Sequence, residues 1–317
     1  MATTSYHVPV LLDETLEQLD LKPGAVIVDG TLGGGGHAAA ILERTAPDGI
    51  LIGLDLDPDA IREAGRRLAP FGDRVRLVQA SFRHLERVAR EENPSGIDGV
   101  LLDLGVSSHQ LDRPERGFRF SPGPASPLDM RMDPEHEGAT AARLLATLPA
   151  ADLERMFSEY GELPGARRLA RAIVERRETA TLATAKDLIE VIQGAGIGHG
   201  RSHNPATLVF QALRIAVNDE LAALEEGLEA AIRVLRPGGR LVVLTYHSLE
   251  DRIVKHAIRS AAKGCVCPPS FPVCRCGIAP RLALATRRPI EPSAREIETN
   301  ARARSARLRA AIRLEAA

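Results

Sequence analysis

The first hundred residues alternate short apolar runs with amphipathic segments of helical period. Three of the apolar runs end in an aspartate, and these are Val26–Val28 before Asp29, Ile50–Leu54 before Asp55 and Val100–Leu102 before Asp103. A fourth run covers Val75–Val78, and the segments between the runs predict helices at His37–Arg44, Pro58–Ala69 and His84–Glu92. Strands that alternate with helices in this way favour a parallel sheet with helices on both faces. We therefore predict an α/β fold with a doubly wound, mostly parallel sheet.

The alternation stops after Gln110. The stretch Leu111–Asp133 is rich in Pro, Gly, Arg and Asp and predicts irregular structure. Helices are predicted next at Ala139–Leu148, Ala150–Tyr160, Ala166–Arg177, Thr184–Gln193, Pro205–Val217, Asp219–Val234 and Ser248–Lys263, and strands at Arg240–Tyr246 and, more weakly, Arg281–Thr286 and Ala306–Arg313. We predict a sheet domain in two parts, residues 1–110 and 206–317, interrupted by a helical insertion at 111–205.

Composition narrows the class of protein. The chain has 317 residues, 44% of them apolar, and no apolar run approaches the ~20 residues of a membrane span. The start of the chain lacks the pattern of a secretory signal, so we expect a cytoplasmic protein without a membrane partner. Net charge is −1, but residues 281–313 hold nine arginines and three glutamates. This basic segment could contact phosphates, although a solvated basic face is the stronger reading of charge alone.

The loop from Asp29 to His37 joins a predicted strand to a predicted helix and contains four consecutive glycines. Glycine permits close backbone approach to a ligand, and a helix N-terminus presents unpaired N–H groups. Asp55 follows Gly36 by 19 residues and could accept the hydroxyls of a ribose, as in NAD or S-adenosylmethionine sites. Asp29 would repel a pyrophosphate and favour the cationic end of S-adenosylmethionine. The loop therefore favours methyl transfer over hydride transfer.

The other strand ends add three candidates. Phe82 follows the third strand, where it could stack on an adenine ring or serve as a core side chain. Asp57 precedes Pro58 and is predicted to cap a helix, with a second ribose contact as the alternative. Asp103 ends the fourth strand and is predicted to point into the crevice shared by donor and acceptor, since ligands of doubly wound folds bind there.

Motifs along nearly the whole chain resemble the MraW family, the small-subunit ribosomal RNA methyltransferases H. They are His7-x-Pro9-Val10-Leu11-Leu12, the Asp29–His37 loop, Leu102–Ser108, Gln110-Leu111-Asp112, Glu115–Phe118, Pro127–Met132, Asn204–Thr207, Phe210-Gln211-Ala212, His247–Arg252 and Asn300-x-Arg302-x-Arg304-Ser305. The chain departs from the family pattern at Tyr246, where phenylalanine is frequent, and at Gly161–Ala166.

This resemblance implies S-adenosylmethionine-dependent N4-methylation of a cytidine, position 1402, in the decoding centre of 16S rRNA. It implies 16S rRNA within the small ribosomal subunit as the partner, and an inserted helical domain for substrate recognition. The implied donor-binding residues are Gly35, Gly36, His37, Asp55, Phe82, Asp103 and Gln110. No pattern in the sequence indicates an oligomeric state.

Cytosine N4 is a poor nucleophile, so an acceptor beside it would assist attack on the methyl group. The Asp/Ser/Asn-Pro-Pro-aromatic motif of many amino-methyltransferases is missing, and Asp103-Leu104-Gly105 stands in its place. Our hypothesis assigns the catalytic role to Asp103 or to neighbouring backbone carbonyls. Arg116, Phe118, Arg131, Asn204 and His247 are candidates to contact the RNA, with packing or capping as the alternative for each.

All four cysteines fall in one segment, as Cys265-x-Cys267 and Cys274-x-Cys276. Four thiolates can bind a structural zinc ion, although C-x-C is not the usual spacing, and a redox disulfide pair is a further alternative. No catalytic metal is expected. Three other functions remain open at this point, namely methylation of DNA or a protein amine, a non-catalytic ribosome-assembly factor that binds the donor, and, least favoured, an NAD oxidoreductase.

Overall fold

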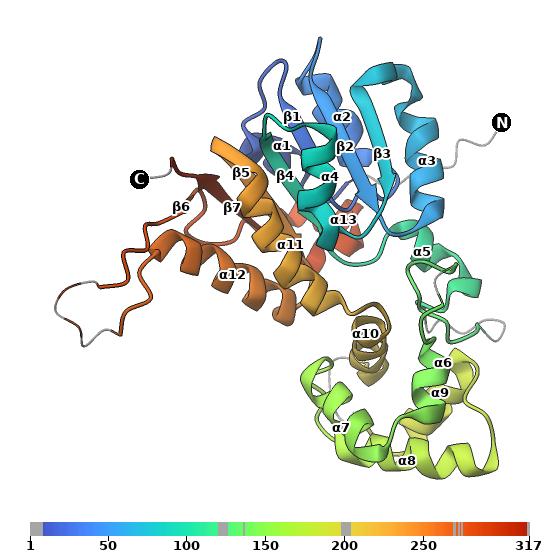
Figure 1. Cartoon of the computed structure of the whole chain (residues 1–317). Helices are drawn as coiled ribbons and strands as arrows, with labels where there is room; N and C mark the ends of the chain where they lie inside the picture. The colour runs from blue at the N-terminus through green and yellow to red at the C-terminus, as the bar shows by residue number, and fades with distance from the viewer. Residues whose placement is uncertain are drawn as a thin grey trace. The chain divides into compact units, whose positions relative to one another are not determined.

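The computed structural model describes residues 9–119, 126–135, 137–197, 204–268, 271, 273 and 275–315. The chain divides into two compact units, shown in Figure 1. The first unit comprises Met1–Gly105 and Leu221–Ala317, and the second comprises Val106–Glu220. The second unit thus extends beyond the insertion predicted at 111–205, by five residues at its start and fifteen at its end.

The first unit is built on a seven-stranded sheet (Figure 1). Its strands are β1 (Val26–Asp29), β2 (Ile50–Asp55), β3 (Val75–Gln79), β4 (Ile97–Asp103), β5 (Leu235–Thr245), β6 (Leu282–Leu284) and β7 (Arg307–Arg313), in the order β3-β2-β1-β4-β5-β7-β6. The first five pair in parallel, and β7 is antiparallel to both β5 and β6. The predicted doubly wound, mostly parallel sheet is confirmed, and the two weak C-terminal strands complete one edge of it.

Successive residues of a strand point to opposite sides of the sheet, so apolar strands expose apolar side chains on both faces. Helices cover both of these faces. Val28 and Leu102 face one apolar cluster, with α4 (Leu85–Glu92), α11 (Glu220–Val234) and α12 (Ser248–Lys263). Their neighbours Ile27 and Leu101 face the other cluster. That second layer contains α1 (Leu12–Leu19), α2 (Gly36–Arg44), α3 (Pro58–Leu68) and η4 (Ala301–Ser305), while η1 (Ala69–Arg74), η2 (Phe82–His84) and α13 (Ala294–Thr299) complete the unit. Strands in the middle of the sheet therefore need apolar side chains on both faces, and the runs Val26–Val28 and Val100–Leu102 supply them.

The second unit is helical. It contains α5 (Ser108–Asp112), η3 (Pro114–Arg116), α6 (Ala141–Thr147), α7 (Ala150–Glu159), α8 (Ala166–Thr179), α9 (Ala185–Gly194) and α10 (Pro205–Asn218). Phe157, Leu169, Leu188 and Leu213 are fully buried at its centre and come from four different helices. The helices predicted between 139 and 217 are confirmed, and α10 packs into this core. None of the helices in the described part of the chain combines the length and apolarity that crossing a membrane requires.

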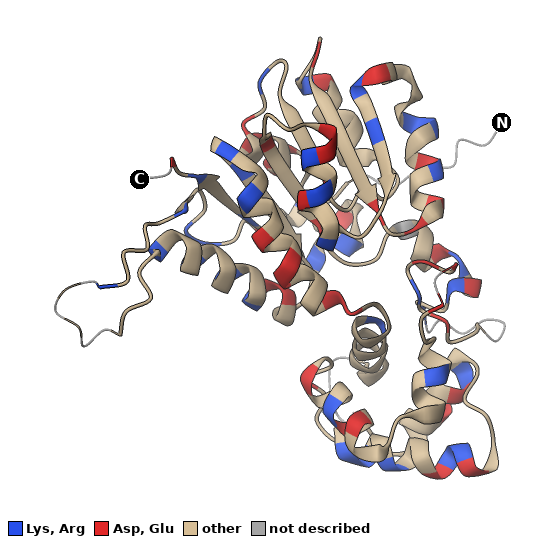
Figure 2. Cartoon of the chain, in the orientation of Figure 1, with Lys and Arg blue, Asp and Glu red and all other residues tan. Residues whose placement is uncertain are grey.

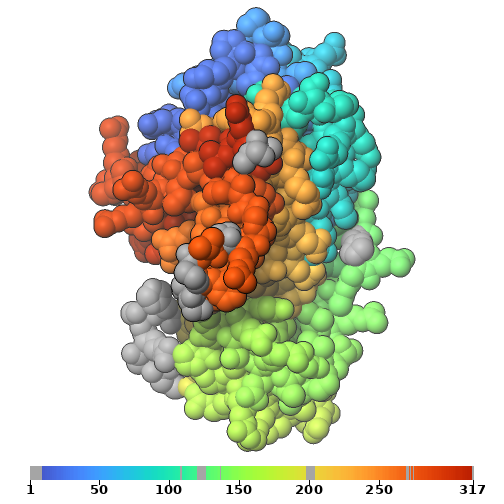
Figure 3. All heavy atoms as spheres, turned by 60° about the vertical axis from the view of Figure 1, so that its left-hand side comes forward, coloured from blue at the N-terminus to red at the C-terminus, as the bar shows by residue number. Residues whose placement is uncertain are grey.

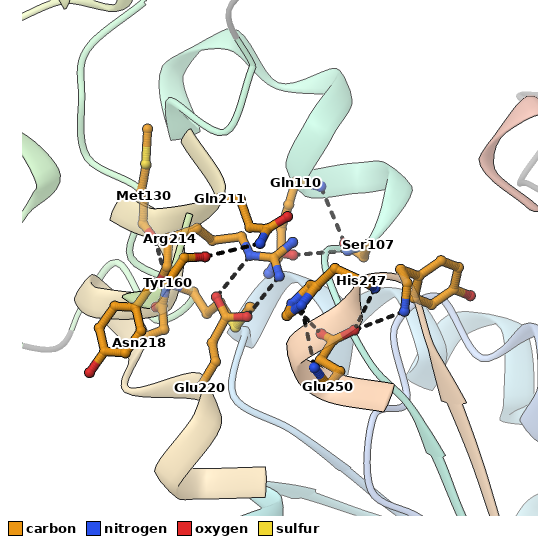
Figure 4. Close-up of polar contacts among 12 residues, drawn as sticks. Ser107, Gln110, Met130, Tyr160, Gln211, Arg214, Asn218, Glu220, His247 and Glu250 are labelled. Carbon is orange, nitrogen blue, oxygen red and sulfur yellow. Dashed lines mark hydrogen bonds and ion pairs between the residues drawn. The ribbon is translucent and has the colours of Figure 1, made fainter. Parts of the chain in front are cut away.

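Polar contacts fasten the C-terminal end of α10 within this unit, as Figure 4 shows. Arg214 binds the Glu220 carboxylate through two hydrogen bonds of 2.9 and 2.8 Å. The Asn218 side-chain amide donates to the Met130 carbonyl oxygen at 2.8 Å. A bidentate Arg–carboxylate pair fixes orientation as well as distance, so it orders the end of α10. From that end, Asn218 holds the irregular segment around Met130 in place.

Thr184→Ala is expected to lower the free energy of unfolding by about 1 kcal/mol, because it removes the N-cap of α9. The Thr184 hydroxyl accepts from the Asp187 N–H, and the Asp187 carboxylate accepts from the Thr184 N–H at 2.9 Å in return. Thr147→Ala is the matched control, since that exposed hydroxyl only donates to a carbonyl within α6. Urea denaturation should show no more than about 0.5 kcal/mol for the control. Equal losses in the two variants would contradict the capping argument.

Candidate functional site

Three aspartates end neighbouring strands at one edge of the first unit's sheet. Asp29 ends β1, Asp55 ends β2 and Asp103 ends β4, and these strands are adjacent and parallel. Asp29 is 1% exposed, whereas the Asp103 side chain is 24% exposed. The carboxyl edge of a doubly wound sheet is where such folds bind ligands, so the acidic residues lie at the position expected for a site.

The loop predicted as a donor cradle is fastened to the strands on either side of it. The Asp55 carboxylate accepts hydrogen bonds from the Gly33 N–H at 2.8 Å and the Asp57 N–H at 2.9 Å. On the other side, the Thr31 hydroxyl accepts from the Asp103 N–H at 2.6 Å. The loop is therefore fixed before any ligand arrives, and Thr31 has a holding role that the sequence did not indicate. The prediction that Asp57 caps a helix is confirmed, since it accepts from the Asp59 N–H.

Close packing also requires glycine at Gly35 and Gly36, two of the predicted donor-binding residues. Gly35 has a φ of 73° and precedes α2, and a Cβ atom there would lie 3.3 Å from the Cβ of Ala64. A Cβ on Gly36 would lie 2.6 Å from Cγ of Pro9. Gly33 differs, because with a φ of 51° its missing Cβ would meet nothing nearer than 4.0 Å. The loop thus leaves room at Gly33, while Gly35 and Gly36 set how closely α2 packs.

Asp29, Asp55 and Asp103, here called the acidic edge, have pKa values above their ordinary range. Burial, together with the charges of Asp103 and Asp55, raises the pKa of Asp29 to about 7. Burial raises the pKa of Asp55 to about 6, although backbone N–H groups oppose the shift. The pKa of Asp103 is also raised by burial, against the opposing effect of His37. Negative charge is therefore disfavoured at this edge, and a cationic ligand would relieve it.

Asp103 lies between two side chains of the same unit. The Tyr246 hydroxyl donates to Asp103 Oδ1 at 2.7 Å, and His37 Nδ1 lies 3.6 Å from Asp103 Oδ2. The other His37 nitrogen, Nε2, lies 3.1 Å from the Val10 carbonyl oxygen, which can only accept, so Nε2 carries the hydrogen. Burial and the Asp103 charge raise the pKa of Tyr246 well above its ordinary value, which keeps the phenol a donor. Tyr246 was missed as a site residue because 143 positions separate it from Asp103.

Phe82 lies at the start of η2, where it packs against the apolar cluster under α11. A Cβ on Gly227 of α11 would lie 2.5 Å from the Phe82 ring, so this helix approaches the ring closely only because residue 227 is glycine. Phe82 is thus half-buried at the margin of this cluster, and its stacking on a donor stays a prediction.

Gln110 belongs to the second unit and forms a capping box with Ser107 at the start of α5 (Figure 4). Its side-chain oxygen accepts from the Ser107 N–H at 2.9 Å, and its own N–H donates to the Ser107 hydroxyl at 3.2 Å. The helix of five residues depends on this reciprocal pair for its start. The predicted contact of Gln110 with the donor stays a prediction.

The five candidates for RNA contact all have structural partners. Arg116 is 7% exposed and donates to two backbone carbonyls, and Phe118 is part of the second unit's core. Arg131 pairs with a neighbouring aspartate, Asn204 caps α10 and His247 caps α12. Figure 4 shows how His247 contacts the glutamate of the first turn of α12. The packing and capping alternatives are therefore confirmed for these residues.

The basic segment at 281–313 is also engaged internally. Arg281 binds the Glu229 carboxylate at 3.0 Å, and Arg309 binds Asp251 at 2.7 Å with its side chain only 11% exposed. Arg307 contributes a second contact to Asp251. These three of the nine arginines in the segment therefore have carboxylate partners on the neighbouring helices.

Comparison with known proteins shows the family of this chain. The model of the MraW methylase family matches residues 4–314. The chain is 52% identical over 313 residues to the ribosomal RNA small subunit methyltransferase H of Symbiobacterium thermophilum, covering 98% of each chain. It is 52% identical over 312 residues to the protein of that name from Carboxydothermus hydrogenoformans, covering 97% of this chain and 98% of that one. The chain belongs to the MraW methylase family, and it is an enzyme that transfers a methyl group from S-adenosylmethionine.

Proposed function

We propose that this enzyme methylates N4 of a cytidine in 16S rRNA, at position 1402 of the decoding centre, within the small ribosomal subunit of the cytoplasm. The names of its relatives support ribosomal RNA of the small subunit as the acceptor. One observation on this chain supports the donor side of the proposal. Three carboxyl groups, the buried Asp29 and the half-buried Asp55 and Asp103, end adjacent strands and have raised pKa values. Such a cluster suits a ligand with a positive charge and ribose hydroxyls.

We assign donor binding to Gly35, Gly36, His37, Asp55, Phe82, Asp103 and Gln110. Asp55 already holds the loop through Oδ2 and the next turn through Oδ1, and each carboxylate oxygen has a second lone pair that can accept a ribose hydroxyl. Asp29 lies beneath the loop, where its charge would favour the cationic end of the donor. S-adenosylmethionine supplies an electrophilic methyl group, so the protein needs mainly to position the acceptor in line with it.

Asp103 is the candidate catalytic residue. Its side chain is partly exposed, and Tyr246 and His37 restrict its orientation from two sides. An Asp103 carboxylate that accepts a hydrogen bond from the amino group of cytosine would localise the nitrogen lone pair and take up the positive charge that develops during attack. Tyr246 is a positioning residue in this scheme, because it touches Asp103 rather than the reacting atoms.

RNA contact is assigned to the basic helix α8 of the second unit. This helix has five arginines and two glutamates, and in Figure 2 blue segments of ribbon, which mark Lys and Arg, are distributed along it. Arg167, Arg168 and Arg171 are exposed and line a hollow of the second unit together with parts of α9. Exposed arginines of this density can neutralise backbone phosphates, and splayed single strands are the RNA form whose bases a protein can reach.

The alternatives are separated by direct assay of the acceptor. Small subunits from cells that lack the enzyme should take up tritiated methyl groups from S-adenosylmethionine, and nuclease digestion should place the label in N4-methylcytidine. Transfer to DNA or a protein amine, or no transfer despite donor binding, would overturn the proposal. An otherwise identical reaction with subunits from wild-type cells is the control, because their cytidine is already modified.

A further inference from the structure

The segment between α12 and β6 has no helix or strand among its described residues. It runs from Gly264 to Arg281, and Figure 3 shows its described residues in orange at the surface of the first unit. Val266 is 67% exposed and Val273 70%, so these side chains do not form a core. Long connections without helices or strands are uncommon in compact domains and often have a function.

The thiols of this segment converge. The Sγ atoms of Cys265, Cys267 and Cys276 all lie within 4.8 Å of one another, and each residue is half-buried. In tetrahedral zinc–thiolate sites the Zn–S distance of about 2.3 Å places sulfurs roughly 3.8 Å apart. The three sulfurs therefore need to close by no more than about an ångström to bind one ion.

The backbone around the thiols also suits thiolate ligands. The Arg275 N–H donates to Cys267 Sγ at 3.3 Å. An N–H that points at a sulfur offsets negative charge on the sulfur and orients it, as groups around metal ligands do. Arg275 itself extends over the Phe271 ring, with 6.0 Å from guanidinium carbon to ring centre, and adds positive charge to the segment.

We propose that Cys265, Cys267 and Cys276 bind a structural zinc ion that fixes the segment between α12 and β6. A tetrahedral ion takes a fourth ligand in addition to these three thiolates. The remaining cysteine of the sequence, Cys274, lies outside the described residues and is not assigned to the site. The thiols release their protons as they bind the ion. The site stands apart from the methyl-transfer chemistry, because its residues come from the loop after α12 and not from the carboxyl edge of β1, β2 and β4.

Zinc is favoured over a pair of disulfides by the arrangement of the sulfurs. Disulfides would join the cysteines two by two, whereas the structure brings three sulfurs to one point. An all-thiolate set selects zinc or an iron–sulfur cluster among biological metals, and a single ion fits three sulfurs that lie this close together.

Metal analysis of the full-length enzyme, purified without a tag or chelator and with reductant present, tests the site. We expect one zinc per chain by mass spectrometry of the digested protein. Cys265→Ser, Cys267→Ser and Cys276→Ser should each reduce zinc to less than a tenth of that amount. Val273→Ser is the matched control in the same segment and should keep the full complement, because its side chain is exposed and offers no ligand.

Two further readouts keep the proposal testable if a variant folds poorly. Cobalt(II) added to the wild-type apoprotein should produce the intense visible and near-ultraviolet absorption of a tetrahedral thiolate site. Zinc should also protect the Arg275–Gly277 stretch from trypsin, and a chelator should abolish that protection. Absence of stoichiometric metal, iron in place of zinc, or two intact disulfides by mass spectrometry under reducing purification would overturn the proposal.

Discussion

Asp103→Asn is expected to lower kcat by about 10²- to 10⁴-fold at saturating donor, while the protein stays folded. Asparagine keeps the shape of the side chain and its oxygen can still accept from the Tyr246 hydroxyl, which lies 2.7 Å from Asp103 Oδ1. It loses the charge that would stabilise the cation developing on cytosine N4. Single-turnover assays with small subunits isolate this step from product release, and calorimetry measures the donor Kd separately.

Tyr246→Phe provides the comparison that separates positioning from catalysis. The hydrogen bond from Tyr246 lowers the pKa of Asp103, so its loss should raise that pKa further. The acidic limb of the pH–rate profile should then move to higher pH, with kcat at the plateau reduced by only about tenfold or less. If Asp103→Asn and Tyr246→Phe lowered kcat equally at every pH, the contact between these two residues would have a purely structural role. Near-normal turnover of Asp103→Asn would remove the side chain from the mechanism.

Much of the fold could be predicted because its determinants are local. In the middle of a parallel sheet both faces of a strand are buried, so Val26–Val28 and Val100–Leu102 stand out as continuous apolar runs. Asp29, Asp55 and Asp103 could be placed at one edge for the same reason, since parallel strands end on the same side. Topology alone therefore brought the three carboxyl groups together.

The contacts around the carboxyl groups could not be predicted, because they join residues far apart in the sequence. Thr31 and Tyr246 both bind Asp103, and neither lies in a pattern that indicates a partner 72 or 143 positions away. Gly35 and Gly36 could be assigned only to a ligand, whereas Ala64 and Pro9 crowd them in three dimensions. Sequence patterns do not report what packs against a given residue.

Three α-helices were not predicted from the sequence, namely α1, α5 and α13, and local signals are weak at α1 and α13. The helix α1 starts at Leu12 after Leu11, which has a φ of 50° and makes no side-chain cap. The helix α13 has six residues and no buried side chain, so it lacks an apolar stripe. Both are stabilised by their surroundings, and Glu296 of α13 accepts a hydrogen bond from the Leu11 N–H at 2.7 Å. A contact between the two ends of the chain replaces the missing cap.

Donor affinity is expected to rise on the order of 50-fold between pH 5.5 and 7.0. In the donor-free protein the pKa is about 7 for Asp29 and about 6 for Asp55, so both bind protons in the lower part of this range. A cationic donor with ribose hydroxyls favours the ionised forms, so binding releases these protons, and affinity increases as pH rises through the two values. Calorimetry with S-adenosylmethionine at several pH values measures the slope, and repeats in buffers of different ionisation enthalpy count the protons released.

Donor affinity should increase as pH rises, whereas the free energy of unfolding of the donor-free protein should decrease. Raised folded-state pKa values mean that the native chain binds more protons than the unfolded chain between about pH 4 and 7, so these carboxyl groups favour unfolding as pH rises. Asp29→Asn should weaken the pH dependence of both donor affinity and the free energy of unfolding. Asp55 alone should leave an affinity change of only about fourfold between pH 5.5 and 7.0. The variant should also have a higher Tm than the wild-type protein at pH 7.5. Asp152→Asn is the control, because that carboxylate pairs with Arg155 at the surface of the second unit and does not end a strand of the sheet. Donor affinity that is independent of pH in the wild-type enzyme would mean that Asp29 and Asp55 stay protonated, or stay ionised, throughout binding, and the electrostatic account of donor selection would fail.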